Sequence, residues 1–196
     1  MLTPQQGQVL VRWARQQIEH HLEVAPSRPV DAGERRQPEL QQVRGVFVTL
    51  HKRSALRGCI GSLTGVEPVV DGVRRHALNA AFHDHRFQPL TAAELAELHV
   101  EVSVLTEPRP LSCEDADQLL RLLRPGIDGV ILEGPGGAGA TFLPQVWRQL
   151  PEPEQFLGHL CRKAGLAEDA WRSGRLHIST YQVQSFEEPR SGGNHT

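Results

Sequence analysis

The sequence has few cysteines and no long apolar run, and each shortage disfavours a class of protein. Its three cysteines, Cys59, Cys113 and Cys161, are widely and irregularly spaced, which disfavours a disulfide framework and predicts reduced thiols. No stretch approaches the roughly 18 to 20 apolar residues that a membrane span needs. The first residues also lack the basic head and apolar run of an export signal. We therefore expect a cytoplasmic protein.

The sequence also has little net charge. Its 196 residues carry a formal charge of −2, which argues against a surface built as a whole to hold nucleic acid. One local excess remains, because residues 28–57 contain seven basic and three acidic side chains. This stretch could contact an anionic small molecule or nucleic acid, but a solvated loop of mixed charge is the more ordinary explanation.

The order of the patterns predicts an α+β fold with antiparallel sheets and packed helices. Apolar residues at helical spacing predict helices near 4–22, 68–82 and 153–164, and prolines predict a long irregular connection over 26–42. Runs of β-branched residues predict a hairpin over 43–60 and strands near 99–105, 130–133, 140–143 and 175–186. In the last of these the apolar phase switches, which indicates a bulge or a strand shared between two faces.

The segment of greatest chemical interest is LRGCIG, residues 56–61. If it is extended, Arg57 and Cys59 project from the same face about 7 Å apart, and a guanidinium there favours the thiolate. Gly58 and Gly61 allow a backbone or a ligand to approach closely. Cys59 and Arg57 are therefore the candidate catalytic residues. The alternative is a small thiol packed between strands, since free cysteine is commonly buried.

A second polar cluster, FHDHRF, occupies residues 82–87. His83, His85 and Asp84 could bind a divalent metal or supply a base for Cys59. A solvated helix end, with Arg86 near the negative end of the helix dipole, is the commoner arrangement. No HExxH or CxxC spacing selects further ligands, so we predict no metal site.

The glycine-rich run at residues 134–139 matches the pattern GxGxxG. A dinucleotide site needs a helix directly after this pattern, whereas a strand-like segment and a proline follow here. We therefore predict a hairpin tip, and we expect no cofactor.

At the LRGCIG hexapeptide the chain resembles a known family, the AmmeMemoRadiSam system protein A family, relatives of the candidate protein of the AMME chromosomal region. Seven stretches carry this resemblance: GVFVTLHK (45–52), LRGCIGSL (56–63), DHRFQPLT (84–91), EVSVLT (101–106), PGIDGVILE (125–133), TFLPQVW (141–147) and FLGHLCRKAGL (156–166). The family usually has a proline or a similar small residue where His85 stands. This departure weakens any metal role for His85.

The resemblance implies a fold of two lobes with a cleft between them, beside the LRGCIG turn. The larger lobe is expected from residues 1–90 and 153–190 and the smaller from 91–152, with a frayed tail at 191–196. The family's genes lie near those of Memo-like and radical SAM proteins, which are therefore the implied partners. The family supplies no catalytic residues to transfer, only the LRGCIG positions as a suspected functional turn.

The leading hypothesis is a protein that binds a small anionic or carbonyl-bearing molecule and reacts through the Cys59 thiolate. The expected binding residues are Arg57, Gly58, Cys59, Ile60, Gly61, Asp84, Arg86 and Phe87. A non-catalytic adaptor for Memo-like and radical SAM proteins is the alternative. Nucleic-acid binding through residues 28–57 is the third. The sequence leaves open whether the protein is an enzyme.

Overall fold

In the computed structural model, which describes residues 1–189, the chain groups into two compact units. The first unit comprises Met1–Leu105 with the described residues from Gln184 on, and the second comprises Thr106–Val183. Each unit has its own sheet and its own hydrophobic core. The fold is α+β, as the sequence patterns predict. Within residues 1–189, no helix combines the length and the apolar character that crossing a bilayer requires.

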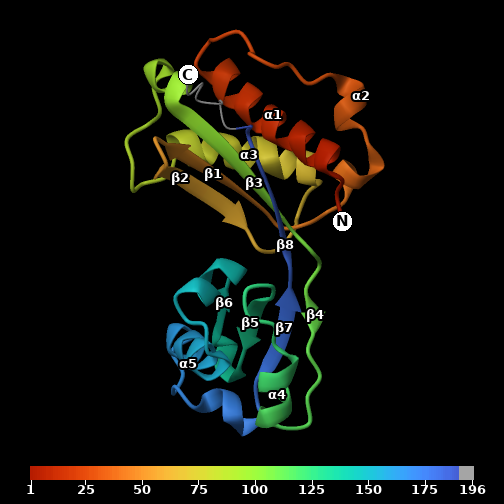
Figure 1. Cartoon of the computed structure of the whole chain (residues 1–196), viewed down its shortest axis with the longest axis vertical. Helices are drawn as coiled ribbons and strands as arrows, with labels where there is room; N and C mark the ends of the chain where they lie inside the picture. The colour runs from red at the N-terminus through yellow and green to blue at the C-terminus, as the bar shows by residue number, and fades with distance from the viewer. Residues whose placement is uncertain (190–196) are drawn as a thin grey trace, which may run out of the picture. The chain divides into compact units, whose positions relative to one another are not determined.

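The first unit is a sheet with two long helices packed against one face (Figure 1). In chain order its elements are α1 (Pro4–His21), α2 (Ala32–Arg35), η1 (Pro38–Gln41), β1 (Val46–Lys52), β2 (Ala55–Ser62), α3 (Val69–Phe82), η2 (Ala92–Glu97), β3 (Leu98–Leu105) and β8 (Val183–Glu187). The strands lie in the order β2-β1-β3-β8, so β2 is an edge strand.

Helix α1 begins at a capping box and is fixed to α3 by a buried tryptophan. The hydroxyl of Thr3 accepts a hydrogen bond from the backbone N–H of Gln6, whose side chain accepts one from the backbone of Thr3. The apolar stripe of α1 then packs into the core. Trp13 donates its indole N–H to the carbonyl of Val70 in α3 at 3.0 Å.

Alternation along β1 and the first half of β3 gives the first sheet one buried apolar face and one more polar face. Val46, Val48 and Leu50 of β1 are buried with the helices, as are the valines of β3. We call the opposite side the outward face. From the alternation and the strand pairing, its residues are Phe47, Thr49, His51, Cys59, Gly61, His99, Glu101 and Ser103.

The second unit packs two aromatic side chains and a helix against a smaller sheet. Its elements are β4 (Arg109–Pro110), α4 (Ala116–Leu122), β5 (Gly129–Glu133), η3 (Pro135–Gly137), β6 (Gly139–Phe142), η4 (Pro144–Arg148), α5 (Pro153–Lys163), η5 (Ala170–Ser173) and β7 (His177–Tyr181). The strands lie in the order β4-β7-β5-β6. Trp147 stacks on Phe156 of α5 with ring centroids 3.7 Å apart. The glycine-rich run joins β5 to β6 as the predicted hairpin tip.

The bounds of the two units differ from the expected lobe boundaries. Strand β3 pairs along its length with β1, and therefore residues 91–105 belong to the first unit. Helix α5 packs on β6, where Lys163 donates to the carbonyl of Thr141 at 3.0 Å, and residues 153–183 belong to the second. The expected tail at 191–196 lies outside the described residues.

The strand predicted over 175–186 is two strands in different sheets. Gln182 separates β7 from β8, and its backbone exchanges hydrogen bonds with Thr106, both at 2.8 Å. The chain therefore passes from one sheet to the other at Gln182. The switch of apolar phase, from Ile178 to Tyr181, falls within β7 itself.

Candidate functional site

The LRGCIG segment forms most of β2 and contains a β-bulge. The pairing of β1 with β2 shifts after Leu50, and Arg57 is the residue of β2 left without a partner. A bulge interrupts the alternation of side chains along a strand. The expectation that Arg57 and Cys59 project from one face assumed a regular extended segment, and the strand is not regular at this point.

The Arg57 guanidinium is held by a carboxylate. Its Nε and Nη2 donate to the two oxygens of Glu94 at 3.0 and 3.1 Å, and Nη2 also donates to the carbonyl of Gln88. Lys52 shares Glu94 at 3.0 Å. Hydrogen bonds from Arg57, with those from Lys52, hold the pKa of Glu94 well below its usual range despite its burial. The charge of Arg57 is thus compensated, although its buried Nη1 has no partner among the described residues.

Cys59 is half-buried, and its backbone and side chain are each held by one neighbouring segment. Thr49 donates its hydroxyl hydrogen to the Cys59 sulfur at 3.4 Å. The backbone N–H of Cys59, at the open edge of β2, donates to Asp84 Oδ2 at 2.9 Å. The Cys59 carbonyl accepts a hydrogen bond from Arg86 Nη2 at 3.2 Å. The segment after α3 therefore closes the open edge of β2 at this residue.

Asp84 and Arg86 form the ion pair that covers this edge. The Asp84 side chain is 4% exposed and accepts from Arg86 Nε and Nη2 at 2.9 and 2.7 Å. These bonds hold the pKa of Asp84 well below its usual range. The same hydrogen bonds raise the pKa of Arg86. Arg86 is therefore the cation beside Cys59, in the place the sequence assigned to Arg57.

The Arg86 side chain is 56% exposed and extends along an aromatic ring. Its guanidinium carbon lies 5.5 Å from the centre of the Phe87 ring, and that of Arg57 lies 5.9 Å from the same centre. The bonds from Arg86 to Asp84 and Cys59 use Nε and Nη2. Nη1 makes no hydrogen bond within the described residues and is available to a ligand.

Both glycines of LRGCIG are required by close packing. A Cβ at Gly58 would lie 2.1 Å from the carbonyl oxygen of Ala80 in α3, and a Cβ at Gly61 would lie 2.3 Å from the Phe47 ring. Ile60, between them, packs against the core of the first unit. Gly58, Ile60 and Gly61 therefore shape and support the edge strand.

The two histidines of the FHDHRF cluster do not join the site. His83 and His85 are exposed, and within residues 1–189 no hydrogen bond links either ring to Cys59. The same part of the chain contains no group of three or more His, Cys, Asp or Glu residues arranged to hold a metal ion. Of this cluster, the structure brings Asp84, Arg86 and Phe87 to the edge of β2.

Sequence reasoning missed three residues of this region. Thr49 contacts the sulfur, Glu94 compensates Arg57, and Glu101 lies opposite Thr49 on the outward face. The alternation in GVFVTLHK and EVSVLT does assign Thr49 and Glu101 to the polar sides of their strands. The pairing of the two strands, which the sequence does not specify, was the missing information.

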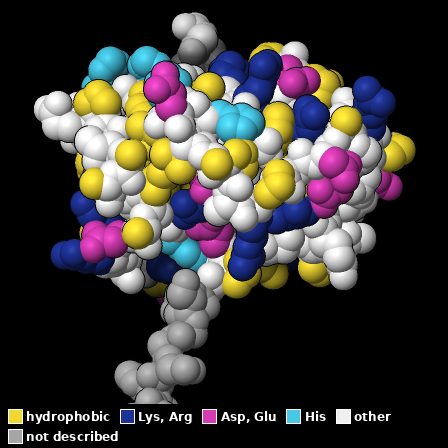
Figure 2. All heavy atoms as spheres, turned by 90° about the horizontal axis from the view of Figure 1, so that it is seen from above, with side chains coloured by type: hydrophobic (Ala, Val, Ile, Leu, Met, Phe, Trp, Pro, Cys, Tyr) yellow, Lys and Arg dark blue, Asp and Glu magenta, His cyan; other side chains and the backbone are white. Residues whose placement is uncertain are grey.

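The basic stretch at 28–57 does not form one continuous surface. Arg35 lies over the Trp13 ring at 4.4 Å, Arg53 pairs with Glu97, and Lys52 is bound to Glu94. On the face seen in Figure 2, basic side chains occur in small groups separated by acidic and apolar ones. The carboxylates of Glu94 and Glu97 compensate part of the local charge excess that a phosphate backbone would require.

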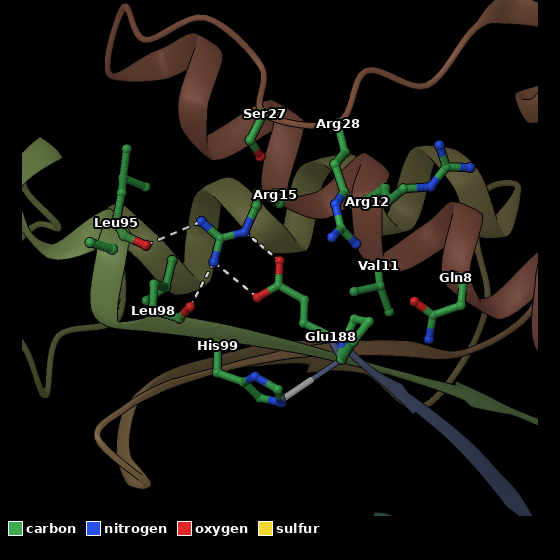
Figure 3. Close-up of a pocket in the computed structure, with 12 residues that line it drawn as sticks. Gln8, Val11, Arg12, Arg15, Ser27, Arg28, Leu95, Leu98, His99 and Glu188 are labelled. Atoms are coloured by element: carbon green, nitrogen blue, oxygen red, sulfur yellow. Dashed lines mark hydrogen bonds and ion pairs between the residues drawn. The ribbon is translucent and has the colours of Figure 1, made fainter. Parts of the chain in front are cut away.

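Arg28 from this stretch lines a pocket of about 270 Å³ beside α1 (Figure 3). Arg15, a half-buried cation of the pocket, forms an ion pair with Glu188 and donates to the carbonyls of Leu95 and Leu98 at 3.3 and 2.6 Å. Arg15 therefore ties α1 to the start of β3 and to the chain after β8. The hydrogen bonds that Arg15 donates therefore stabilise the fold of the first unit.

Comparison with known proteins gives consistent matches over most of the chain. The protein-family model described as AMMECR1 matches residues 11–186. A protein of Thermofilum pendens is 38% identical over 98% of this chain and 94% of its own length. A protein of Methanothermobacter thermautotrophicus is 40% identical over 95% of this chain and 96% of its own. The crystal structure of an uncharacterised protein of Pyrococcus horikoshii superposes with a TM-score of 0.76 at 36% identity, covering 93% of this chain and 91% of that one.

Proposed function

We propose that this chain, which belongs to the AMMECR1 family, binds a small anionic or carbonyl-bearing molecule at the edge of β2 and reacts with it through Cys59. The observation that carries this proposal is the position of Arg86. Its exposed guanidinium is anchored to buried Asp84 and to the carbonyl of Cys59, and Nη1 remains for a ligand. A carboxylate or carbonyl oxygen on Arg86 would hold the rest of the molecule near the thiol.

Two features support a reactive rather than a packing role for Cys59. The residue is half-buried, whereas Cys161 is fully buried in the second core, where burial raises the pKa of its thiol. A hydroxyl donor and a guanidinium also lie beside Cys59. Hydrogen-bond donors and cations of this kind favour the thiolate, which is the nucleophilic form of cysteine.

Alkylation of the native protein tests the proposal with cysteines of the same chain as references. Iodoacetate and iodoacetamide differ in charge, and mass spectrometry gives the rate at each cysteine. We expect the ratio of the iodoacetate to the iodoacetamide rate to be at least about threefold higher at Cys59 than at exposed Cys113, because Arg86 attracts the carboxylate. R86Q should remove that difference.

Thermal melting separates chemistry from packing. C59S should abolish labelling at this position while leaving the melting temperature almost unchanged, with C113S as the matched control. A native Cys59 that resists both reagents, together with a C59S variant several degrees less stable, would identify a packing cysteine and overturn the proposal.

A second candidate is a non-catalytic adaptor for Memo-like and radical SAM proteins. It is favoured by two exposed apolar side chains. Leu56, the first residue of LRGCIG, is 43% exposed, and Val66, five residues after LRGCIG ends, is 77% exposed. Co-purification with such partners that survives C59S and R86Q but is lost in the double variant L56S/V66S would favour this function.

A further inference from the structure

Three residues form one row across the outward face of the first sheet. Thr49 is paired with Cys59 on one side and with Glu101 on the other. Paired residues share a face, and adjacent strands lie about 4.8 Å apart, which places the Cα atoms of Cys59 and Glu101 about 10 Å apart. The thiol and the carboxylate therefore stand on either side of the Thr49 hydroxyl, at a spacing that a small molecule can bridge.

Glu101 differs from its neighbours in having no basic partner. Glu94 holds Arg57 and Lys52, Asp84 holds Arg86, and Glu188 holds Arg15. Among the described residues, Glu101 contacts no Lys, Arg or His within ion-pair distance. The hydrogen bond found for its carboxylate is donated by the Ser103 hydroxyl at 3.5 Å.

A half-buried carboxylate without a cation is costly unless water or a ligand compensates its charge. Ser103 is itself bound to Ser185 at 2.8 Å, and its hydroxyl therefore serves two partners. The acceptor capacity of Glu101 is largely unused by the protein. A ligand that reaches across Thr49 from Cys59 would meet these oxygens.

We propose that the ligand of the Cys59 site carries a cationic group, of the primary ammonium type, that Glu101 binds on the outward face. This inference rests on the proposed function and adds a positively charged group to its ligand. The anionic or carbonyl group lies at Arg86, and the ammonium group lies across β1 at Glu101. The protein thereby gains selectivity, because a ligand without the cationic group leaves Glu101 uncompensated.

Three methanethiosulfonates of different charge test the inference on the full chain. The trimethylammonium-ethyl reagent is cationic, the sulfonato-ethyl reagent is anionic and the methyl reagent is neutral. In each reaction the Cys59 thiolate forms a disulfide bond with the sulfenyl sulfur, and methanesulfinate leaves with the bonding electrons. The measured quantity is the rate at Cys59 for each charged reagent divided by the rate for the neutral one.

We expect E101Q to lower the normalised rate of the cationic reagent about threefold to tenfold and to raise that of the anionic reagent. E187Q is the matched control, since it removes a carboxylate on β8 at the opposite edge of the sheet, and its ratios should stay within about twofold of wild type. An E101Q variant that melts like wild type with unchanged ratios would overturn the inference, as would one in which all three reagents slow equally.

Failure of this inference can be told from failure of the proposed function. If Cys59 reacts and R86Q alters its preference for anionic reagents while E101Q alters nothing, the anionic site stands and the cationic subsite does not. If native Cys59 reacts with none of the reagents, both proposals fall.

Discussion

Thr49 and Cys59 face each other across the β1–β2 pair, and the threonine hydroxyl donates to the cysteine sulfur at 3.4 Å. A hydrogen bond from a hydroxyl group becomes stronger when its acceptor is charged. The contact therefore couples the chemistry of β2 to a residue on the neighbouring strand.

T49V tests this coupling with almost no change in shape. Hydrogen bonds to charged groups are worth about 1.5–3 kcal/mol, so the alkylation of Cys59 by iodoacetamide at pH 7 should slow roughly tenfold. T49S retains the hydroxyl and should stay within about threefold of wild type. Equal rates in all three proteins, measured by mass spectrometry, would mean that the hydroxyl does not act on the sulfur.

Alanine substitutions of two glycines, Gly58 in β2 and Gly72 in α3, should change the free energy of unfolding in opposite directions. In G58A the new methyl group meets a backbone carbonyl oxygen at 2.1 Å, which cannot move without displacing α3. We expect a loss of at least about 3 kcal/mol in the free energy of unfolding, or no folded protein. In G72A, within α3, the nearest atom is 3.5 Å away, and replacing a helical glycine should stabilise by up to about 1 kcal/mol.

Urea denaturation of both variants checks this pair. A G58A protein as stable as wild type would show that α3 does not pack on β2 as closely as described. A destabilised G72A protein would show that α3 packs on β1 too closely to accept the added methyl group, whose nearest neighbour is a methyl carbon of Val46.

Local patterns were sufficient for most helices and strands of this fold and insufficient for its site. The hairpin tip before β6 was predicted from adjacent residues and is present. The capping boxes at Thr3 and Thr91 are local features of the same kind. Such features depend on contacts between residues three to five apart, which the sequence displays directly.

The site depends on pairing between distant strands and on one irregularity. The bulge at Arg57 turns its guanidinium to Glu94, and a single inserted residue in a ladder has no local signature in LRGCIG. The partners of Cys59 lie 10 residues before it, at Thr49, and 25 residues after it, at Asp84. The sequence identified Asp84 and Arg86 as residues of interest, but their role as a cover for the strand edge required the register.

Asp84 should contribute to stability through the edge that it covers. D84N removes the charge that holds Arg86 and weakens the bond to the Cys59 backbone, and we expect a loss of about 2 kcal/mol in the free energy of unfolding. D71N is the matched control, because Asp71 and Arg74 form an exposed pair at 3.9 Å and should contribute less than about 0.5 kcal/mol. Equal effects of the two variants in urea denaturation would contradict the buried role of Asp84.

His76 should make the protein less stable in mild acid. It is 3% exposed in α3, and burial lowers its pKa to about 4, with neighbouring Arg75 acting in the same direction. The folded protein therefore keeps His76 neutral where the unfolded chain, with an ordinary value near 6.5, binds a proton. Stability then rises with pH through this window, and lowering the pH from 7.5 to 5 should cost about 2 kcal/mol.

H76L removes this titration and should flatten the pH dependence of the free energy of unfolding between pH 5 and 7.5. H85Q alters an exposed histidine and should leave the slope as it is in wild type. The window stops at pH 5 because Asp84 and Glu94, whose pKa values are held low in the folded protein, add their own loss of stability in stronger acid. An unchanged slope in H76L, followed by urea denaturation at each pH, would show that His76 is protonated in the folded state and that its surroundings accept the charge.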